Sequence, residues 1–193
     1  LQRKALLANP LLDFDQLLLI KRRPLGGDAR RARGDRTNDK GLGKFLGIPQ
    51  QSSWHLHTMT KTDAWDNEIA VLSGLKTNSS IKTLYRPPSG RLVNEMDLHY
   101  DAGKLMFSMP DERKHWQIFE MDMSTRQLRQ ISPRDQIDVH NFDACYLPNE
   151  RIAFISTAPF QGVPCNASVN VGMTYLMNAD GSGIRQLCFE QDH

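Results

Sequence analysis

Histidine and cysteine side chains give this chain its greatest potential for metal or redox chemistry. The 193-residue sequence contains six histidines and three cysteines. Imidazole and thiolate groups bind transition metals when several of them converge on one point. Spacing alone does not force convergence here, because His55 and His57 form a weak close pair and no H-E-x-x-H motif occurs.

The cysteines do not form a recognisable motif. Cys145, Cys165 and Cys188 give no even-numbered disulfide framework, and none lies in C-x-x-C or C-x-x-C-H. The segment therefore lacks a zinc-ribbon signature and a covalent haem-attachment site. Cys145 and Cys188 lie on predicted strands and are interpreted as small core hydrophobes. Cys165 lies in a predicted loop, where it is either a packed structural residue, the favoured interpretation, or a metal-binding or reactive thiol.

A repeated block defines the elements that must position these side chains. Each copy has 14 residues, with a short apolar strand, a polar turn and a second short strand, at Val71–Leu84, Ile118–Ile131 and Thr174–Leu187. The first two copies are 47 residues apart, and the third follows after 56 residues because of a nine-residue excess within 158–172. Four-stranded units at a period of about 40–50 residues are typical of β-propeller blades.

We therefore predict an all-β chain that forms a segment of a β-propeller, with about two and a half to three four-stranded blades and a short N-terminal helix. The ring is expected to be incomplete, since closed propellers have about four to eight blades. The predicted units are a helical lead-in (1–11), a first strand with an irregular insertion (12–65), the outer strands of the first blade (66–91), a second blade (92–140) and a third blade (141–193). The predicted strands are 17–21, 68–72, 80–85, 92–98, 104–109, 117–123, 127–131, 142–147, 151–157, 173–178 and 183–188.

Propeller topology assigns most of the candidate ligands to one face. Loops between the second and third strands of a blade emerge on the same face as the connections between blades, and the hairpin turns emerge on the other. The first face receives His55, His57, His115, His140, Cys165 and His193. His99 falls on the opposite face. These side chains either line a metal or redox-cofactor pocket or are ordinary loop residues too far apart to converge, and the second interpretation is favoured.

Other chemistry is weakly represented. The net charge of +2 and a basic cluster within 21–36 that lacks interleaved aromatic residues favour a solvated loop over a nucleic-acid partner. No apolar run approaches the length of about 20 residues that spans a membrane. Four aspartates near strand ends are interpreted as turn caps in preference to acid–base pairs: Asp97, Asp122, Asp143 and Asp180. We predict no catalytic residues in this segment.

Several stretches resemble the repeat of TolB-like propellers, notably residues 143–156 (DACYLPNERIAFIS) and 177–187 (MNADGSGIRQL). With residues 7–24, 66–75 and 160–167, they also resemble large planctomycete-type proteins related to the middle domain of the hydrazine synthase alpha subunit. The resemblance implies a periplasmic or otherwise exported protein. Catalysis in hydrazine synthase depends on c-type haems, whose attachment motif is absent here, so we expect no cofactor in this segment and haem or metal only in flanking regions.

The favoured functional prediction is a non-catalytic platform that binds a partner protein or another domain of the same polypeptide. The alternative is the propeller domain of a multi-haem redox enzyme subunit. A hydrolase built on a propeller is a third hypothesis, although the sequence offers no nucleophile elbow or converging acid pair for it.

Overall fold

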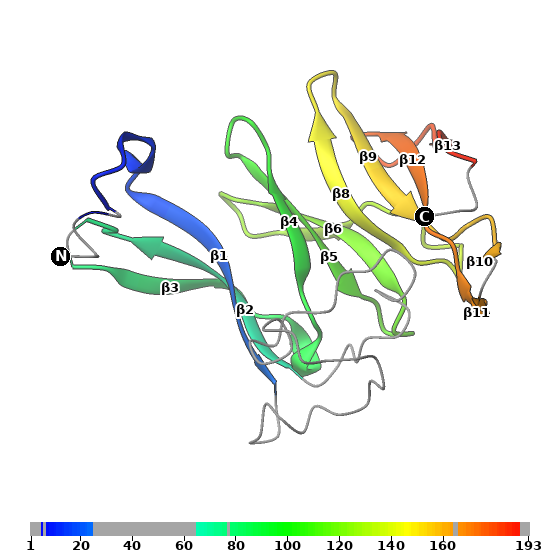
Figure 1. The fold of residues 1–193 in the computed structure, drawn as a ribbon, viewed down its shortest axis with the longest axis horizontal. Coiled ribbons are helices and arrows are strands. Elements are labelled where there is room, and N and C mark those ends of the chain that lie inside the picture. The colour runs from blue at the N-terminus through cyan, green and yellow to red at the C-terminus, as the bar shows by residue number, and fades with distance from the viewer. Residues whose placement is uncertain (1–4, 6, 25–64, 77, 164–165, 190–193) are drawn as a thin grey trace.

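The computed structural model describes residues 5, 7–24, 65–76, 78–163 and 166–189. Within these residues, three antiparallel sheets lie side by side in an arc (Figure 1). Blade 1 has the order β1-β2-β3, blade 2 the order β4-β5-β6-β7 and blade 3 the order β8-β9-β12-β13. A small hairpin, β10-β11, lies in the loop between β9 and β12. The predicted all-β propeller segment is therefore confirmed.

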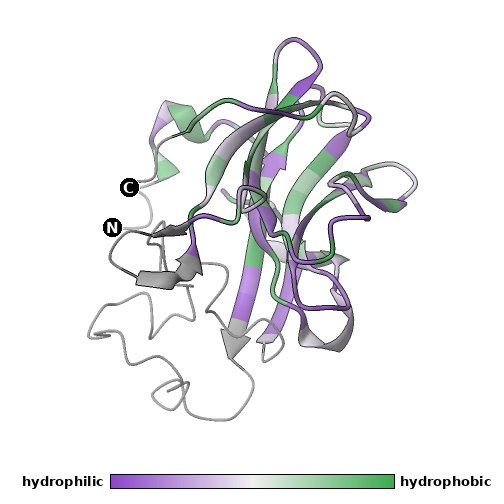
Figure 2. Ribbon diagram, turned by 90° about the vertical axis from the view of Figure 1, so that its right-hand side faces the viewer, coloured by the Kyte–Doolittle hydropathy of each residue, from purple (hydrophilic) through white to green (hydrophobic). Residues whose placement is uncertain are grey.

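The strand bounds follow the sequence pattern closely. Blade 1 contains β1 (Gln16–Pro24), β2 (Trp65–Ser73) and β3 (Ser80–Tyr85). Blade 2 contains β4 (Asn94–Leu98), β5 (Lys104–Pro110), β6 (Trp116–Asp122) and β7 (Leu128–Gln130). Blade 3 contains β8 (Asn141–Leu147), β9 (Arg151–Ser156), β12 (Met173–Asn178) and β13 (Arg185–Gln186), with the hairpin β10 (Gly162–Val163) and β11 (Asn166–Asn170). Apolar stretches run along the strands, and hydrophilic residues occupy most of the turns (Figure 2).

Two expectations near the N-terminus need correction. The sequence predicts a helical lead-in that the Asn9-Pro10 pair stops. Ala5 and Leu7 are helical, but Asn9-Pro10 begins a new turn. This 3₁₀ helix, η1, spans Pro10–Leu12, and the Asn9 side chain accepts a hydrogen bond from the backbone of Leu11 at 3.0 Å. Asparagine before proline favours the start of a helix. The asparagine side chain caps a backbone N–H of the first turn, and the proline ring fixes φ at a helical value. A second 3₁₀ turn, η2, spans Pro88–Gly90.

The short apolar run at 17–21 (LLLIK), bounded by Asp and Pro, predicts a buried strand, and this prediction is wrong. Side chains along β1 are half-buried or exposed, and Leu17 is 41% exposed. The corresponding strand of blade 2, β5, is buried along almost its whole length. The difference arises because β5 is packed on both faces: Met106 lies in a cluster with blade 3, and Leu105 and Phe107 lie in a cluster with blade 1. Among the described residues, a neighbouring blade covers only one face of β1.

Apolar side chains fill the spaces between the blades. One cluster joins blades 1 and 2 through Ile69, Leu105, Phe107 and their neighbours. A second cluster joins blades 2 and 3 through Met106, Ile118, Phe154 and Met173, among others. A third contains Trp65, Leu92, Trp116 and Phe142, and so links all three blades near one end of the sheets. Each fully buried large side chain contributes about 1.5–3 kcal/mol, so packing between blades is the main source of stability.

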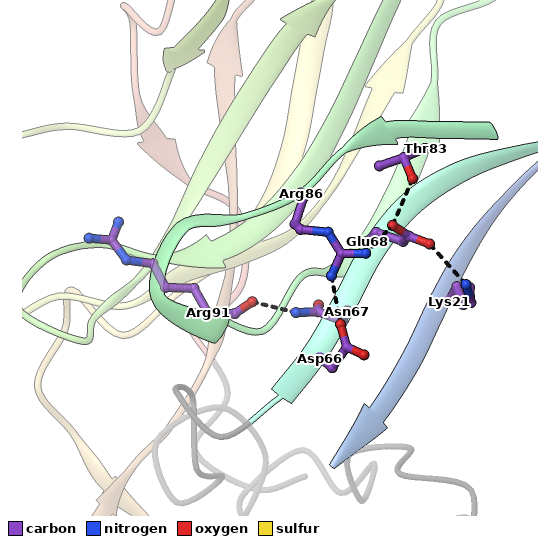
Figure 3. A network of polar contacts seen from close by, with 7 residues as sticks. All are labelled: Lys21, Asp66, Asn67, Glu68, Thr83, Arg86 and Arg91. Atoms are coloured by element: carbon purple, nitrogen blue, oxygen red, sulfur yellow. Dashed lines mark hydrogen bonds and ion pairs between the residues drawn. The ribbon is translucent and has the colours of Figure 1, made fainter. Parts of the chain in front are cut away.

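The face of blade 1 that points away from blade 2 carries a charged network (Figure 3). Glu68 is buried and accepts hydrogen bonds from Thr83 at 2.8 Å and from Arg86 at 2.5 Å, while its other oxygen lies 3.2 Å from Lys21 Nζ. The hydrogen bond from Thr83 contributes most to lowering the pKa of Glu68, against the opposing effect of burial. Arg86 also binds Asp66 at 2.6 Å.

The cysteine predictions are only partly met. Cys145 is exposed and Cys188 half-buried, so neither is the core residue that the sequence suggested. Cys145 lies between Ala144 and Tyr146, which both pack toward blade 2. Since side chains alternate along a strand, the thiol points to the opposite side.

Candidate binding surface on the loop face

The loop face is the end of the sheets where four segments emerge: 86–93 between blades 1 and 2, 111–115 between β5 and β6, 131–140 between blades 2 and 3, and the described parts of 157–172 between β9 and β12. It includes two of the predicted histidines, His115 and His140, and brings them together with ring centroids 5.0 Å apart. The other candidates on this face, His55, His57, Cys165 and His193, lie outside the described residues.

Asp111 fixes the loop that carries His115. Its Oδ1 accepts hydrogen bonds from the backbone N–H groups of Arg113 and His115, both at 2.9 Å. Its own backbone N–H donates to the carbonyl of His115 at 2.8 Å. The reversal is completed by Lys114, which has a positive φ of 67°. A short Asx-type turn of this kind holds the imidazole in one place without a large core behind it.

His140 is held from both sides. Its backbone N–H donates to Thr157 Oγ1 at 2.9 Å, and the Thr157 N–H donates back to the carbonyl of His140 at 3.0 Å. Its Nδ1 accepts from the backbone N–H of Trp116 at 3.2 Å. A nitrogen that accepts carries no proton, so the neutral ring has its proton on Nε2.

Buried polar side chains stiffen the connection beneath the two rings. Gln117 donates from its amide to the carbonyl of Val139 at 2.9 Å. Its Oε1 accepts from Ser132 Oγ at 2.7 Å and from the Asn141 amide at 3.1 Å. Gln117, Ser132 and Asn141 are all buried. A satisfied buried network of this kind fixes the loop's geometry before any partner arrives.

Two exposed apolar side chains stand on the same face, and sequence reasoning missed both. Phe160 is 58% exposed and Ile137 is 54% exposed. Phe160 has a positive φ of 52°, which is unusual for a bulky residue, and its N–H donates to the carbonyl of Thr157 at 3.0 Å. The turn that presents Phe160 is thus built directly on the residue paired with His140. The available signal was the nine-residue excess within 158–172, interpreted only as a loop insertion.

Two buried polar atoms on this face have no hydrogen-bond partner among the described residues. They are His115 Nδ1 and Gln161 Oε1. An unsatisfied buried polar atom costs about 1–3 kcal/mol, and native structures contain few of them. Because both atoms are buried, they lower the stability of the loops that carry them and are not contact points for a partner at the surface.

The other candidate residues have different roles. Asp122 Oδ1 accepts from Ser124 and Thr125, and Asp180 Oδ1 accepts from Ser182, so both cap turns as predicted. These hydrogen bonds, led by those of the serine side chains, lower the pKa of both carboxyl groups. Asp97 does not cap a turn: its Oδ2 accepts from the Tyr146 N–H of blade 3 at 2.7 Å.

His99 lies on the opposite face, as predicted. Its Nδ1 is 2.7 Å from Oδ1 of Asp101, and its ring meets that of Tyr146 edge to face at 4.8 Å. The backbone N–H of Gly103 is the largest cause of the lowered pKa of Asp101, followed by His99.

The described part of the chain shows neither a metal-binding cluster nor a membrane-spanning helix. It brings together no group of three or more His, Cys, Asp or Glu side chains suited to a metal ion. It also contains no helix with the length and apolar character needed to cross a bilayer.

Comparison with known proteins gives solved structures but no sequence family. No protein-family model and no curated protein matches the chain. Its shape is similar to TolB from Acinetobacter baumannii, with TM-score 0.43, 17% identity and coverage of 64% of this chain and 30% of that one. For a putative TolB from Agrobacterium tumefaciens the TM-score is 0.46 and the identity 14%, with coverage of 65% of this chain and 39% of that one. For a chain of a nidogen/laminin complex the TM-score is 0.44 and the identity 13%, with coverage of 63% of this chain and 40% of that one. The chain thus spans less than half the length of each of these structures.

Proposed function

We propose that this propeller segment is a non-catalytic platform that binds a protein partner through its loop face. The observation that carries the proposal is the combination of two exposed apolar side chains, Phe160 and Ile137, with the rigidly held pair His115 and His140. Aromatic and aliphatic anchors on a preorganised surface supply most of the affinity at protein interfaces.

The test is site-specific photocrosslinking in extracts of the source organism. A photoreactive amino acid at position 137 is expected to capture a defined protein, and Phe160→Ser is expected to abolish that capture. Tyr100→Ser is the matched control, because Tyr100 is also exposed but lies on the opposite face, near His99. Equal capture by the Phe160 and Tyr100 variants, or by a probe at position 98, would contradict the proposal.

A second candidate function is binding of a divalent transition-metal ion, favoured by the close contact between His115 and His140. Two imidazoles are common ligands of Cu²⁺ and Zn²⁺. Titration of the chain with Cu²⁺ distinguishes metal binding from protein binding. A d–d absorption band that appears at a stoichiometric amount of Cu²⁺ and is absent in His115→Gln supports metal binding. Unchanged spectra up to a tenfold excess of Cu²⁺ reject it and leave the protein-binding proposal intact.

The finer kinship to the middle domain of the hydrazine synthase alpha subunit and the periplasmic location are part of this proposal. They rest on the sequence resemblance of residues 143–156 and 177–187. An exported protein with this role would assemble with other domains or subunits, and any haem or metal would be held by those partners. Fractionation of the source cells with an antibody against this chain tests the location.

A further inference from the structure

The inner edge of blade 1 differs from those of the other two blades. In blades 2 and 3, an inner strand (β4 or β8) pairs antiparallel with the second strand. In blade 1, β1 holds the position of the second strand and pairs with β2 over nine residues, while its other edge has no partner among the described residues.

The chain also reaches β1 by a different route. In the other blades, the inner strand leads into the second strand through a short hairpin turn. Before β1, however, the chain approaches the turn between β2 and β3: the Asp15 carbonyl accepts from the Gly74 N–H at 3.1 Å, and Asp13 pairs with Lys76 at 3.1 Å. The residues just before β1 therefore cannot also supply an inner strand through such a hairpin.

Blades 2 and 3 show what an inner strand does to its neighbour. Glu95 and Asp97 of β4 each accept a hydrogen bond from the backbone of β8, at the N–H groups of Asp143 (3.0 Å) and Tyr146 (2.7 Å). Glu95 and Asp143 correspond, since both lie at a bulge with positive φ, 49° and 50°. A strand beside β1 that carried two acidic residues at the same spacing would make the equivalent contacts with β4.

A half-buried arginine lies at this position. Arg22 of β1 donates from Nη2 to the Val93 carbonyl and to Asn94 Oδ1, immediately before the bulge of β4. Its Nε is buried and has no hydrogen-bond partner among the described residues. Burial lowers the pKa of Arg22 to about 10, which still leaves the guanidinium charged at neutral pH. Glu95 of β4 lies close enough to oppose this shift, and the positive charge of Arg22 favours a further carboxylate at the unpaired edge of β1.

We propose that the inner edge of β1 binds an extended acidic strand of a partner polypeptide, antiparallel to β1 and with two carboxylates two residues apart. Main-chain hydrogen bonds to β1 give affinity, as in other cases of strand addition. The carboxylates give specificity through Arg22 and the backbone of β4. This edge is separate from the loop-face anchors Phe160 and Ile137, so the inference does not depend on the proposed function.

The probe for the test is a fluorescein-labelled peptide with the sequence of residues 92–99, LVNEMDLH, which reproduces the acidic spacing of β4. Its control is the same peptide with Gln and Asn in place of Glu and Asp. We expect the acidic peptide to bind the 193-residue chain about tenfold more tightly, the difference that one charged hydrogen bond supplies. Amide hydrogen exchange in residues 16–24 should slow when the acidic peptide is bound.

Arg22→Met should remove the preference for the acidic peptide, whereas Lys21→Met should keep it, because Lys21 points to the other face and pairs with Glu68. If Arg22→Met does not fold, a peptide N-methylated at alternate residues replaces it and should lose binding. Equal affinity of the two peptides, protection at β13 in place of β1, or self-association of the chain without peptide binding would each overturn the proposal.

Discussion

The two interfaces between blades use different polar chemistry around similar apolar cores. Between blades 2 and 3, three acidic side chains of blade 2 bind groups of blade 3: Glu95 and Asp97 accept from the backbone of β8, and Glu120 accepts from the Tyr146 hydroxyl at 3.0 Å. Between blades 1 and 2, the bridging groups are an amide and a guanidinium, Asn67 and Arg22. The contrast shows that one repeat can join its neighbours in two ways.

The difference follows from which strand supplies the contact. An inner strand places carboxylates beside the backbone of the next inner strand, and each acid then accepts one N–H. Blade 1 has no inner strand among its described residues, so β1 and β2 reach across to β4 and to the residues before it. The first type of interface fixes strand register directly, whereas the second fixes the connecting segment 91–94.

Among the variants that compare the two interfaces, Glu120→Ala is expected to lower the free energy of unfolding most. Glu120 is buried and accepts from Arg129 at 2.7 and 2.9 Å as well as from Tyr146. Its removal leaves the Tyr146 hydroxyl without this acceptor and should lower the free energy of unfolding by about 2–4 kcal/mol. Urea denaturation followed by far-UV circular dichroism measures the change.

Glu68→Ala is the matched control, because Glu68 is equally buried but binds only within blade 1 (Figure 3). A double-mutant cycle should give a coupling of about 1 kcal/mol between Glu120 and Tyr146. A coupling near zero would show that the acid stabilises its own blade and not the interface.

Sequence periodicity predicted the strands well because it reflects the packing of each blade. The repeat found β3 and β12 with their observed bounds and the other blade strands within a few residues, but it did not predict the β10-β11 hairpin. It failed for the burial of β1, since the exposure of this strand depends on what packs against its sheet, and the local sequence pattern does not reveal that. It also failed for Cys145, where a bulge in β8 and the side of the sheet decide exposure.

Asn67→Ala should have the next largest effect. The Asn67 side chain accepts from the Val93 N–H at 2.7 Å and donates to the Arg91 carbonyl at 2.6 Å, and the residue is buried. Its loss leaves two backbone groups unsatisfied, so we expect a decrease of about 1–3 kcal/mol in the free energy of unfolding. Asn78→Ala, in an exposed turn, should change it by less than about 0.5 kcal/mol. Equal effects would mean that the segment before β4 is not held by Asn67.

The candidate surface was predictable only in outline. Propeller topology correctly placed His115 and His140 on one face, because loop position follows from strand order. Phe160 and Ile137 could not be found this way, since exposure of an apolar residue depends on a backbone turn and its tertiary support. The carboxylate contacts of Glu95 and Asp97 were missed for a related reason, as they join residues nearly 50 positions apart.

Tyr146→Phe is the smallest change and the sharpest probe of the blade 2–blade 3 interface. Loss of the hydroxyl should cost about 1 kcal/mol at neutral pH. Burial first, and Glu120 second, raise the pKa of Tyr146 far above its usual value. The folded protein therefore keeps this proton where the unfolded chain, with a tyrosine pKa of about 10, releases it. Stability from this group is full below pH of about 10 and falls as the pH rises further.

The advantage of the wild-type chain over Tyr146→Phe should accordingly shrink and then reverse in alkaline solution. Urea midpoints measured from pH 7 to pH 11 test this, with Tyr175→Phe as the control within one blade, because Tyr175 donates to Gln186 of the same sheet. Burial also raises the pKa of Tyr175, but no acidic neighbour adds to it. A larger alkaline loss of stability for Tyr146 than for Tyr175 would show the greater pKa shift that deeper burial and the blade 2 carboxylate produce together. Parallel pH profiles would remove the distinction between the two interfaces at this residue.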